Sequence, residues 1–280
     1  MSAQTALIGS RYTPVRGRGR VAWAFLDALV LARRSLLQSL RIPEVIVFST
    51  IQPIMFVLLF RYVFGGAIHV PGGEYVNFLM PGIFVQTMAF GGVTTGIGLA
   101  DDMQKGLIDR FRSLPMSSSA VLTGRTLADL VRNLFTAFVM LVVGFLVGFR
   151  PHSTVLEFVG AILLVMGVSF AFSWISALIG LSVRSVEAAQ SGGFIWLFPL
   201  TFASSAFVPV ATMPWWLRGF AEHNPVTVLA NSLRGLFHVD PTLTAADTHS
   251  AILQAIAWIV GILVVFVPLA VFRYRHTMSR

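Results

Sequence analysis

The chain has 280 residues, of which 56% are hydrophobic and 11% are charged, and its mean hydropathy is +0.79. A soluble domain of this composition would expose a very large apolar surface to water, so the composition predicts an integral membrane protein. The formal net charge of +8 comes from basic residues that are dispersed among apolar segments, which argues against a groove that binds nucleic acid.

The first 41 residues precede the apolar part of the chain and divide into two pieces. Residues 1–20 are rich in Gly, Arg, Ser and Thr and predict a disordered basic tail. Residues 21–41 predict an amphipathic helix lying in the membrane interface. Asp27, Arg34 and Arg41 recur at seven-residue spacing in this segment, so they share a polar face from which the arginines can reach anionic lipid headgroups.

The rest of the chain predicts an all-α membrane domain with six transmembrane helices. About 20 apolar residues are needed to cross a bilayer, and six stretches come close to or exceed this length. This domain covers residues 42–273 and is followed by a short tail, residues 274–280. The predicted spans are approximately residues 45–64, 75–99, 127–149, 155–183, 192–210 and 251–272.

An even number of spans places both termini on the same side of the membrane, and the distribution of basic residues indicates which side. With both termini in the cytoplasm, all 20 Lys and Arg residues lie on the cytoplasmic side except Arg61, Arg150, Arg218 and Arg234. This bias follows the positive-inside rule. The sequence therefore predicts a multi-pass protein of the cytoplasmic membrane with cytoplasmic termini.

A polar, basic island separates the second and third predicted spans, at residues 101–126. Within it, residues 103–114 predict a short amphipathic helix, because Leu107, Phe111 and Leu114 form one stripe at helical spacing. Pro115 then ends this helix. The alternative is a solvated loop that contains a single helical turn.

The predicted extracytoplasmic segment, residues 211–250, also departs from a plain loop. It begins with Pro214, Trp215 and Trp216, and paired tryptophans are typical of the headgroup level. Asn224 and Pro225 form a turn signal that separates two short helical pieces. We therefore expect a helical hairpin that re-enters the outer leaflet; the alternative is an ordinary pair of surface helices.

Sequence motifs for catalysis are absent. The chain has no phosphate-binding loop, no HExxH zinc motif and no GxSxG elbow, and it has no cysteine, so we assign no catalytic residue, no metal site and no cofactor to it. Asp101 and Asp102 lack the third nearby carboxylate that a metal site would need. Asp129 and Arg132 lie near the cytoplasmic end of the third span, where their i, i+3 spacing predicts an ion pair. The middles of the spans carry no charge, whereas transporters driven by protons or sodium place ionisable residues there. The energy for any transport would then come from another protein.

Three sequence stretches together resemble the membrane subunit of type-II ABC exporters, most closely the daunorubicin/doxorubicin-resistance branch. They are NFLMPGIF at the start of the second span, KGLIDRFRSLPMSSSAVLTGRTLADL between spans two and three, and SSAFVPVATMPWWLRGFAEHNPVTVLANSLRGL before the last span. The resemblance covers approximately residues 23–272. One difference is that Asp101, Asp102 and Gln104 occupy the region where many relatives place a glutamate before the glycine.

The resemblance implies a half-transporter that exports a hydrophobic drug, antibiotic or lipid. Two such permeases, identical or paired with a sister subunit, would assemble with two ATP-binding subunits that hold ATP and Mg. The helix at residues 103–114 would then be the coupling helix that rests on the ATPase. The coupling residues would be Lys105, Gly106, Leu107, Arg110, Phe111, Arg112, Leu114 and Pro115.

The same resemblance places the substrate path between two permeases, along faces of spans one, two and five. Gln86 and Phe90 would contribute from span two, and Phe194, Phe198 and Phe202 form an aromatic stripe on span five. Such a stripe can instead serve packing alone. The competing class is a polytopic membrane protein, a scaffold or an enzyme, that works without an ATPase partner.

Overall fold

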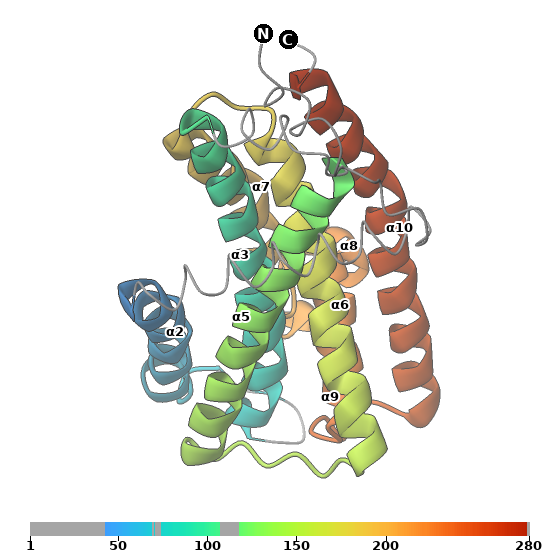
Figure 1. Cartoon of the computed structure of the whole chain (residues 1–280). Helices are drawn as coiled ribbons and strands as arrows, with labels where there is room; N and C mark the ends of the chain where they lie inside the picture. Colours follow the sequence, from blue (N-terminus) through green and yellow to red (C-terminus); the bar gives the residue numbers. More distant parts are fainter. Residues whose placement is uncertain (1–42, 69, 71–73, 107–117, 279–280) are drawn as a thin grey trace, which may run out of the picture.

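The computed structural model describes residues 43–68, 70, 74–106 and 118–278, and within these ranges all regular structure is helical (Figure 1). The predicted interfacial helix at residues 21–41 and most of the predicted coupling helix lie outside the described residues. The helices are α2 (Pro43–Leu58), the π-helical turn η1 (Leu59–Phe64), α3 (Tyr75–Gln104), α5 (Ser118–Leu146), α6 (Val155–Gly180), α7 (Val186–Phe202), the short 3-10 turn η2 (Val210–Thr212), α8 (Trp215–His223), α9 (Pro225–Leu236) and α10 (Ala245–Met278).

Four of these helices, α3, α5, α6 and α10, are long and apolar enough to cross a membrane. The first predicted span corresponds to α2 and η1, of 16 and 6 residues, and the fifth to α7, of 17 residues. The predicted end of the fifth span, at residue 210, is wrong. The helix stops at Phe202, because the chain leaves helical geometry at Ala203 and the Asn224 amide binds the carbonyl oxygens of Leu200 and Ala203.

Helix α3 forms the centre of the bundle and contacts α5, α6, α7 and α9. In the 18-residue apolar stretch of α3, 78% is buried inside the structure, whereas in that of α10 only 11% is buried. Helices α3, α6 and α10 run in one direction and α5 in the other, so the end of α3, the start of α5 and the end of α10 lie at the same end of the bundle (Figure 1). Most of the apolar stretch of α10 is therefore exposed at the surface of the bundle.

Glycines allow α3 and α6 to cross with their backbones in contact. A Cβ atom added at Gly96 would overlap the carbonyl oxygen of Ser176, and one added at Gly180 would overlap the carbonyl oxygen of Gly96. Small residues at a crossing are a common means by which membrane helices approach closely. The α3–α6 pair is therefore held together by close backbone contact.

Gly96→Ala is expected to lower the free energy of unfolding by roughly 1–3 kcal/mol, because the added methyl group forces α3 and α6 apart. Gly160→Ala is the matched control, since its added Cβ would meet no atom within 4 Å. Thermal unfolding of the purified chain in detergent measures both. Equal melting temperatures for the two variants would contradict the close crossing.

The segment that precedes α10 contains the two predicted short helices, α8 and α9, and the turn between them falls at Asn224 as expected. Trp215 and Trp216 are 84% and 66% exposed and follow Pro214 at the start of α8. In contrast, α9 is buried along nearly its whole length from Pro225, which does not fit a surface helix. Whether this hairpin enters the bilayer stays a prediction.

The irregular segment after α7, residues 203–209, obtains hydrogen bonds from side chains. The amide of Asn224 donates to the carbonyl oxygens of Leu200 and Ala203, at 2.7 and 2.9 Å. The hydroxyl of Thr227 accepts a hydrogen bond from the backbone amide of Ser205 at 2.9 Å. Backbone groups deprived of water must be paired inside the protein, so these side chains make a non-helical segment possible at this depth.

Arg234 of α9 completes this arrangement. Its side chain is fully buried, and its guanidinium stacks 3.6 Å from the ring centroid of Phe78. It donates to the carbonyl oxygens of Phe78 and Ser205, at 3.0 and 2.6 Å, and to Oδ1 of Asn231 at 2.7 Å. One guanidinium thereby joins α3, α9 and the irregular segment.

Candidate functional site

Phenylalanine rings from α2, η1, α3, α7 and the irregular segment form a continuous chain of contacts. The rings of Phe90 and Phe198 lie 5.3 Å apart, centroid to centroid, and those of Phe198 and Phe202 lie 5.8 Å apart. Phe207 joins Phe202 at 5.3 Å to Phe60 at 4.4 Å. We call the full set the aromatic array, and it consists of Phe56, Phe60, Phe64, Phe90, Phe194, Phe198, Phe202 and Phe207.

The structure brings together all four phenylalanines that the sequence placed on the substrate path. Phe198 and Phe202 remain 43% and 46% exposed, so these two rings are not enclosed by the chain itself. Sequence reasoning missed the α2 and η1 members. Phe56, Phe60 and Phe64 repeat at four-residue spacing, the same signal that identified the stripe on α7.

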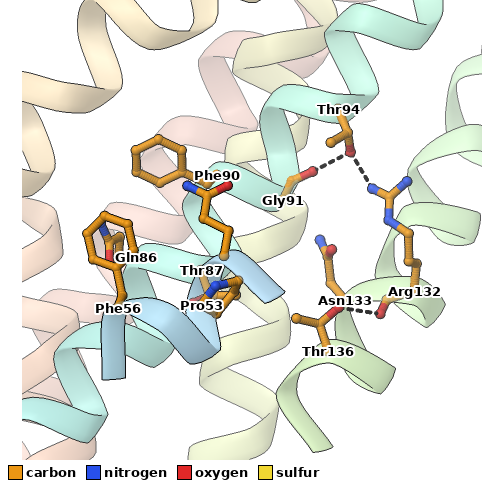
Figure 2. A pocket seen from close by; sticks show the side chains of 11 residues that line it. Pro53, Phe56, Gln86, Thr87, Phe90, Gly91, Thr94, Arg132, Asn133 and Thr136 are labelled. Atoms are coloured by element: carbon orange, nitrogen blue, oxygen red, sulfur yellow. Dashed lines mark hydrogen bonds between the residues drawn. The ribbon is translucent and has the colours of Figure 1, made fainter. Parts of the chain in front are cut away.

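A cavity of about 100 Å³ lies beside the array, between α2, α3 and α5. Figure 2 shows Phe56, Gln86 and Phe90 on one side of it, and Arg132 and Asn133 on the other. The residues that line it are Gln52, Pro53, Phe56, Gln86, Thr87, Phe90, Gly91, Thr94, Arg132, Asn133 and Thr136. The cavity is therefore aromatic toward the array and polar toward α5.

The polar wall of the cavity, formed by α5, contains an ion pair between residues three positions apart on this helix. Arg132 and Asp129 lie 3.0 Å apart, as their spacing predicts, with side chains only 14% and 10% exposed. The hydroxyl of Thr95 donates to Asp129, and Arg132 donates to the hydroxyl of Thr94. Both charges are thus paired and hydrogen-bonded, which a buried ion pair requires. The wall offers polar groups to the cavity with no net charge.

A second polar contact fixes Asn133 in the same wall. Its amide nitrogen donates to the hydroxyl of Ser169 on α6 at 2.7 Å, which links α5 to α6 behind the cavity. Gly91 of α3 faces this amide so closely that an added Cβ would contact it below van der Waals distance. Asn133 of α5 therefore contacts both α3 and α6 at this site.

The predicted coupling helix differs at its start from the structure. Residues 103 and 104 still belong to α3, which ends in a turn at Lys105 and Gly106, and Gly106 adopts the left-handed φ of +64° that favours glycine. The starting point at residue 103 is therefore wrong, because α3 continues one turn further than its apolar stretch. The other coupling residues, Leu107, Arg110, Phe111, Arg112, Leu114 and Pro115, lie outside the described residues.

The helices on either side of this segment are joined by charge. Asp102 near the end of α3 forms an ion pair with Arg125 on α5, and Asp101 pairs with Lys105 at 2.6 Å. Among the residues that the structure describes, no three His, Asp or Glu side chains gather as a metal site would need. The two aspartates therefore act here as ion-pair partners.

Comparison with known proteins adds to this geometry. The sequence profile described as "ABC-2 type transporter" matches residues 27–238. The chain is 33% identical over 274 residues to the daunorubicin resistance ABC transporter permease protein DrrB1 of Streptomyces coeruleorubidus, covering 94% of this chain and 95% of that protein. It is 26% identical to the doxorubicin resistance ABC transporter permease protein DrrB of Mycobacterium tuberculosis, with 88% and 86% covered. It is 25% identical to the putative transport permease ycf38 of Cyanophora paradoxa, with 81% and 80% covered.

Proposed function

Since the chain belongs to the ABC-2 type transporter family, we propose that it is the permease subunit of an ATP-driven exporter for hydrophobic aromatic compounds. The observation that carries this proposal is the aromatic array beside a polar cavity. Two curated relatives are named for resistance to daunorubicin and to doxorubicin, which supports a drug or antibiotic as cargo over a lipid.

In this proposal α2 with η1, α3, α5, α6, α7 and α10 are the six spans of a protein of the cytoplasmic membrane. Both termini and the 107–117 segment are cytoplasmic, and the α8–α9 hairpin re-enters from outside. The positive-inside distribution supports the orientation. The buried α9 and the side-chain hydrogen bonds to the irregular segment support re-entry, because exposed water-bonded loops would not need them.

The proposed assembly contains two permeases and two ATP-binding subunits, and the latter hold ATP and Mg. The segment from Lys105 to Pro115 would rest on an ATP-binding subunit. The ion pair between Asp102 and Arg125 ties together the two helices that flank this segment. A push on the segment would therefore move α3 and α5 as one unit, and with them both walls of the cavity.

A planar aromatic cargo suits the array because its rings can stack on Phe198 and Phe202 without requiring a fixed hydrogen-bond pattern. Its hydroxyl or carbonyl groups can meet the polar wall around Asn133, whose ion pair carries no net charge. Movement of α3 and α5 together against α7 would alter the distance between these two contacts. The geometry thus accommodates amphipathic aromatic molecules better than a polymer or an ion.

Phe198→Ala is expected to reduce daunorubicin export roughly tenfold, because it removes the ring that links Phe90 to Phe202. Phe138→Ala is the control, since Phe138 is 62% exposed on α5 and forms no ring contact within the described residues. Drug efflux from cells that co-express the ATP-binding subunit measures the effect. Equal efflux by the two variants would remove the array from the substrate path.

A further inference from the structure

A second and larger cavity, of about 550 Å³, lies between α6, α7, α10 and the α8–α9 hairpin. Its floor includes Phe172 and Trp196, and its rim includes Phe220 of α8 and Trp258 of α10. Figure 1 shows α10 on the side of the bundle opposite α2, whereas the cavity of Figure 2 lies against α2. The two cavities therefore have different walls, and the proposed cargo path does not use the larger one.

The lining of this larger cavity is apolar and carries no Asp, Glu, Lys or Arg. His223 and Asn224 are its most polar side chains, and the amide of Asn224 already donates to two carbonyl oxygens of the chain. A charged or strongly polar ligand would lose its hydration here without gaining partners. The volume lies in the range of roughly 300–1,000 Å³ that is typical of small-molecule sites. The cavity thus fits a neutral hydrocarbon ligand.

The surroundings of α10 indicate which hydrocarbon is available. This helix is long and apolar, yet only 11% of its 18-residue apolar stretch is buried inside the structure. Val260 and Val264 are 51% and 67% exposed on it. Lipid chains are the natural covering of such a face in a multi-pass membrane protein. Molecules that enter the cavity past α10 therefore come from the bilayer.

A flexible hydrocarbon chain suits this lining because its residues differ in exposure. Phe172 is 1% exposed, whereas Phe220 and Trp258 are 52% and 42% exposed. A single acyl chain can follow the lining from the exposed residues toward Phe172, whereas a helix with its side chains is about 10 Å wide.

We propose that this cavity is a binding site for one acyl chain of a membrane phospholipid. Gly219, Phe220 and His223 of α8 line the cavity, and Figure 1 shows α8 about halfway along the bundle, beside the middle of α10. The cavity thus lies at a level that acyl chains, and not headgroups, occupy in a bilayer. The acyl chain packs against the turn between α8 and α9 and stabilises the contact between Asn224 and the end of α7. The site itself requires only that the protein is embedded in a bilayer; its assignment to the outer leaflet rests on the proposed orientation.

Gly219 provides a direct test, because it lines the cavity and a Cβ atom added there meets nothing within 4 Å. Gly219→Leu would fill part of the cavity without disturbing its walls. Gly261→Leu is the matched control: Gly261 lies exposed on α10, outside the cavity lining, and an added Cβ there also meets no atom within 4 Å. Both variants place the same side chain on the lipid-facing side of the protein.

The experiment uses the full chain in nanodiscs of phosphatidylglycerol that contain a small fraction of phospholipid with a diazirine near the end of one acyl chain. After irradiation, mass spectrometry locates the adducts. We expect adducts on Phe172, which is 1% exposed, or on Trp196, whose ring lies 5.6 Å from it in the cavity lining. Gly219→Leu should lower them about tenfold or more, because Leu displaces at least two methylene groups and each contributes roughly fourfold to binding. Gly261→Leu should leave them unchanged.

Three results would overturn the proposal. The first is the absence of adducts on both floor residues in the unaltered chain. The second is an equal response to the Gly219 and Gly261 substitutions. The third is disulfide formation between copies that carry Phe220→Cys, the only cysteine such a chain would hold, because it would show that a second copy covers the cavity.

Discussion

Replacement of Arg234 by Met is expected to cost roughly 3–5 kcal/mol of the free energy of unfolding. The substitution retains most of the side-chain volume but leaves the buried carbonyl oxygens of Phe78 and Ser205 without this donor. It also removes the stacking on Phe78. A fall in melting temperature of about 10 °C would follow for a chain of this length.

Two further variants separate the effects of burial, guanidinium geometry and positive charge on the melting temperature. Arg218→Met is the matched control, because Arg218 also donates to backbone carbonyl oxygens in the same hairpin but lies exposed. Its loss should change the melting temperature little. Arg234→Lys retains the positive charge but cannot serve acceptors on α3 and on the irregular segment at once, so it should behave like Arg234→Met. A stable Arg234→Met variant would contradict the role assigned to this guanidinium.

Phe111→Ala is expected to abolish most export, by tenfold or more, while the protein still folds and inserts. In the proposed assembly Phe111 is the largest apolar side chain on the stripe that rests in a groove of the ATP-binding subunit. Buried aromatic anchors of this kind contribute a large share of the binding energy of an interface. ATP hydrolysis would continue but would no longer drive movement of α3 and α5. The comparison of drug export with ATPase activity in proteoliposomes measures this uncoupling.

Asp109→Ala is the control for that experiment, because helical spacing places Asp109 away from the stripe of Leu107, Phe111 and Leu114. It should retain coupled transport. Normal export by Phe111→Ala, or an equal loss in both variants, would contradict the coupling role of the stripe.

Local features of the fold could be predicted from the sequence because they depend on residues close together in the chain. The spacing of Asp129 and Arg132 predicted an ion pair that the structure contains. The turn signal at Asn224 and Pro225 predicted the break between α8 and α9. The stripe on α7 predicted neighbouring rings. Each of these follows from helical periodicity or turn chemistry within a few residues.

Contacts between distant parts of the chain could not be predicted in this way. Arg234 was assigned only as one of four basic residues on the outer side, and its contact with Phe78, 156 positions away, requires the tertiary structure. The close approach of Gly96 and Gly180 has the same origin. The early end of α7 depends on Asn224, which takes up the carbonyl groups released there. No single-sequence pattern specifies such pairings.

The central claim is that this chain works as the permease of an ATP-driven exporter, and co-purification tests it most directly. The tagged chain would be expressed together with a candidate ATP-binding subunit, purified, and assayed for ATPase activity with and without an aromatic drug. The proposal predicts a stable complex whose ATPase activity rises when the drug is added. Failure to form a complex with any ATP-binding subunit would contradict it and would leave a membrane protein that has the fold of the family without its mechanism.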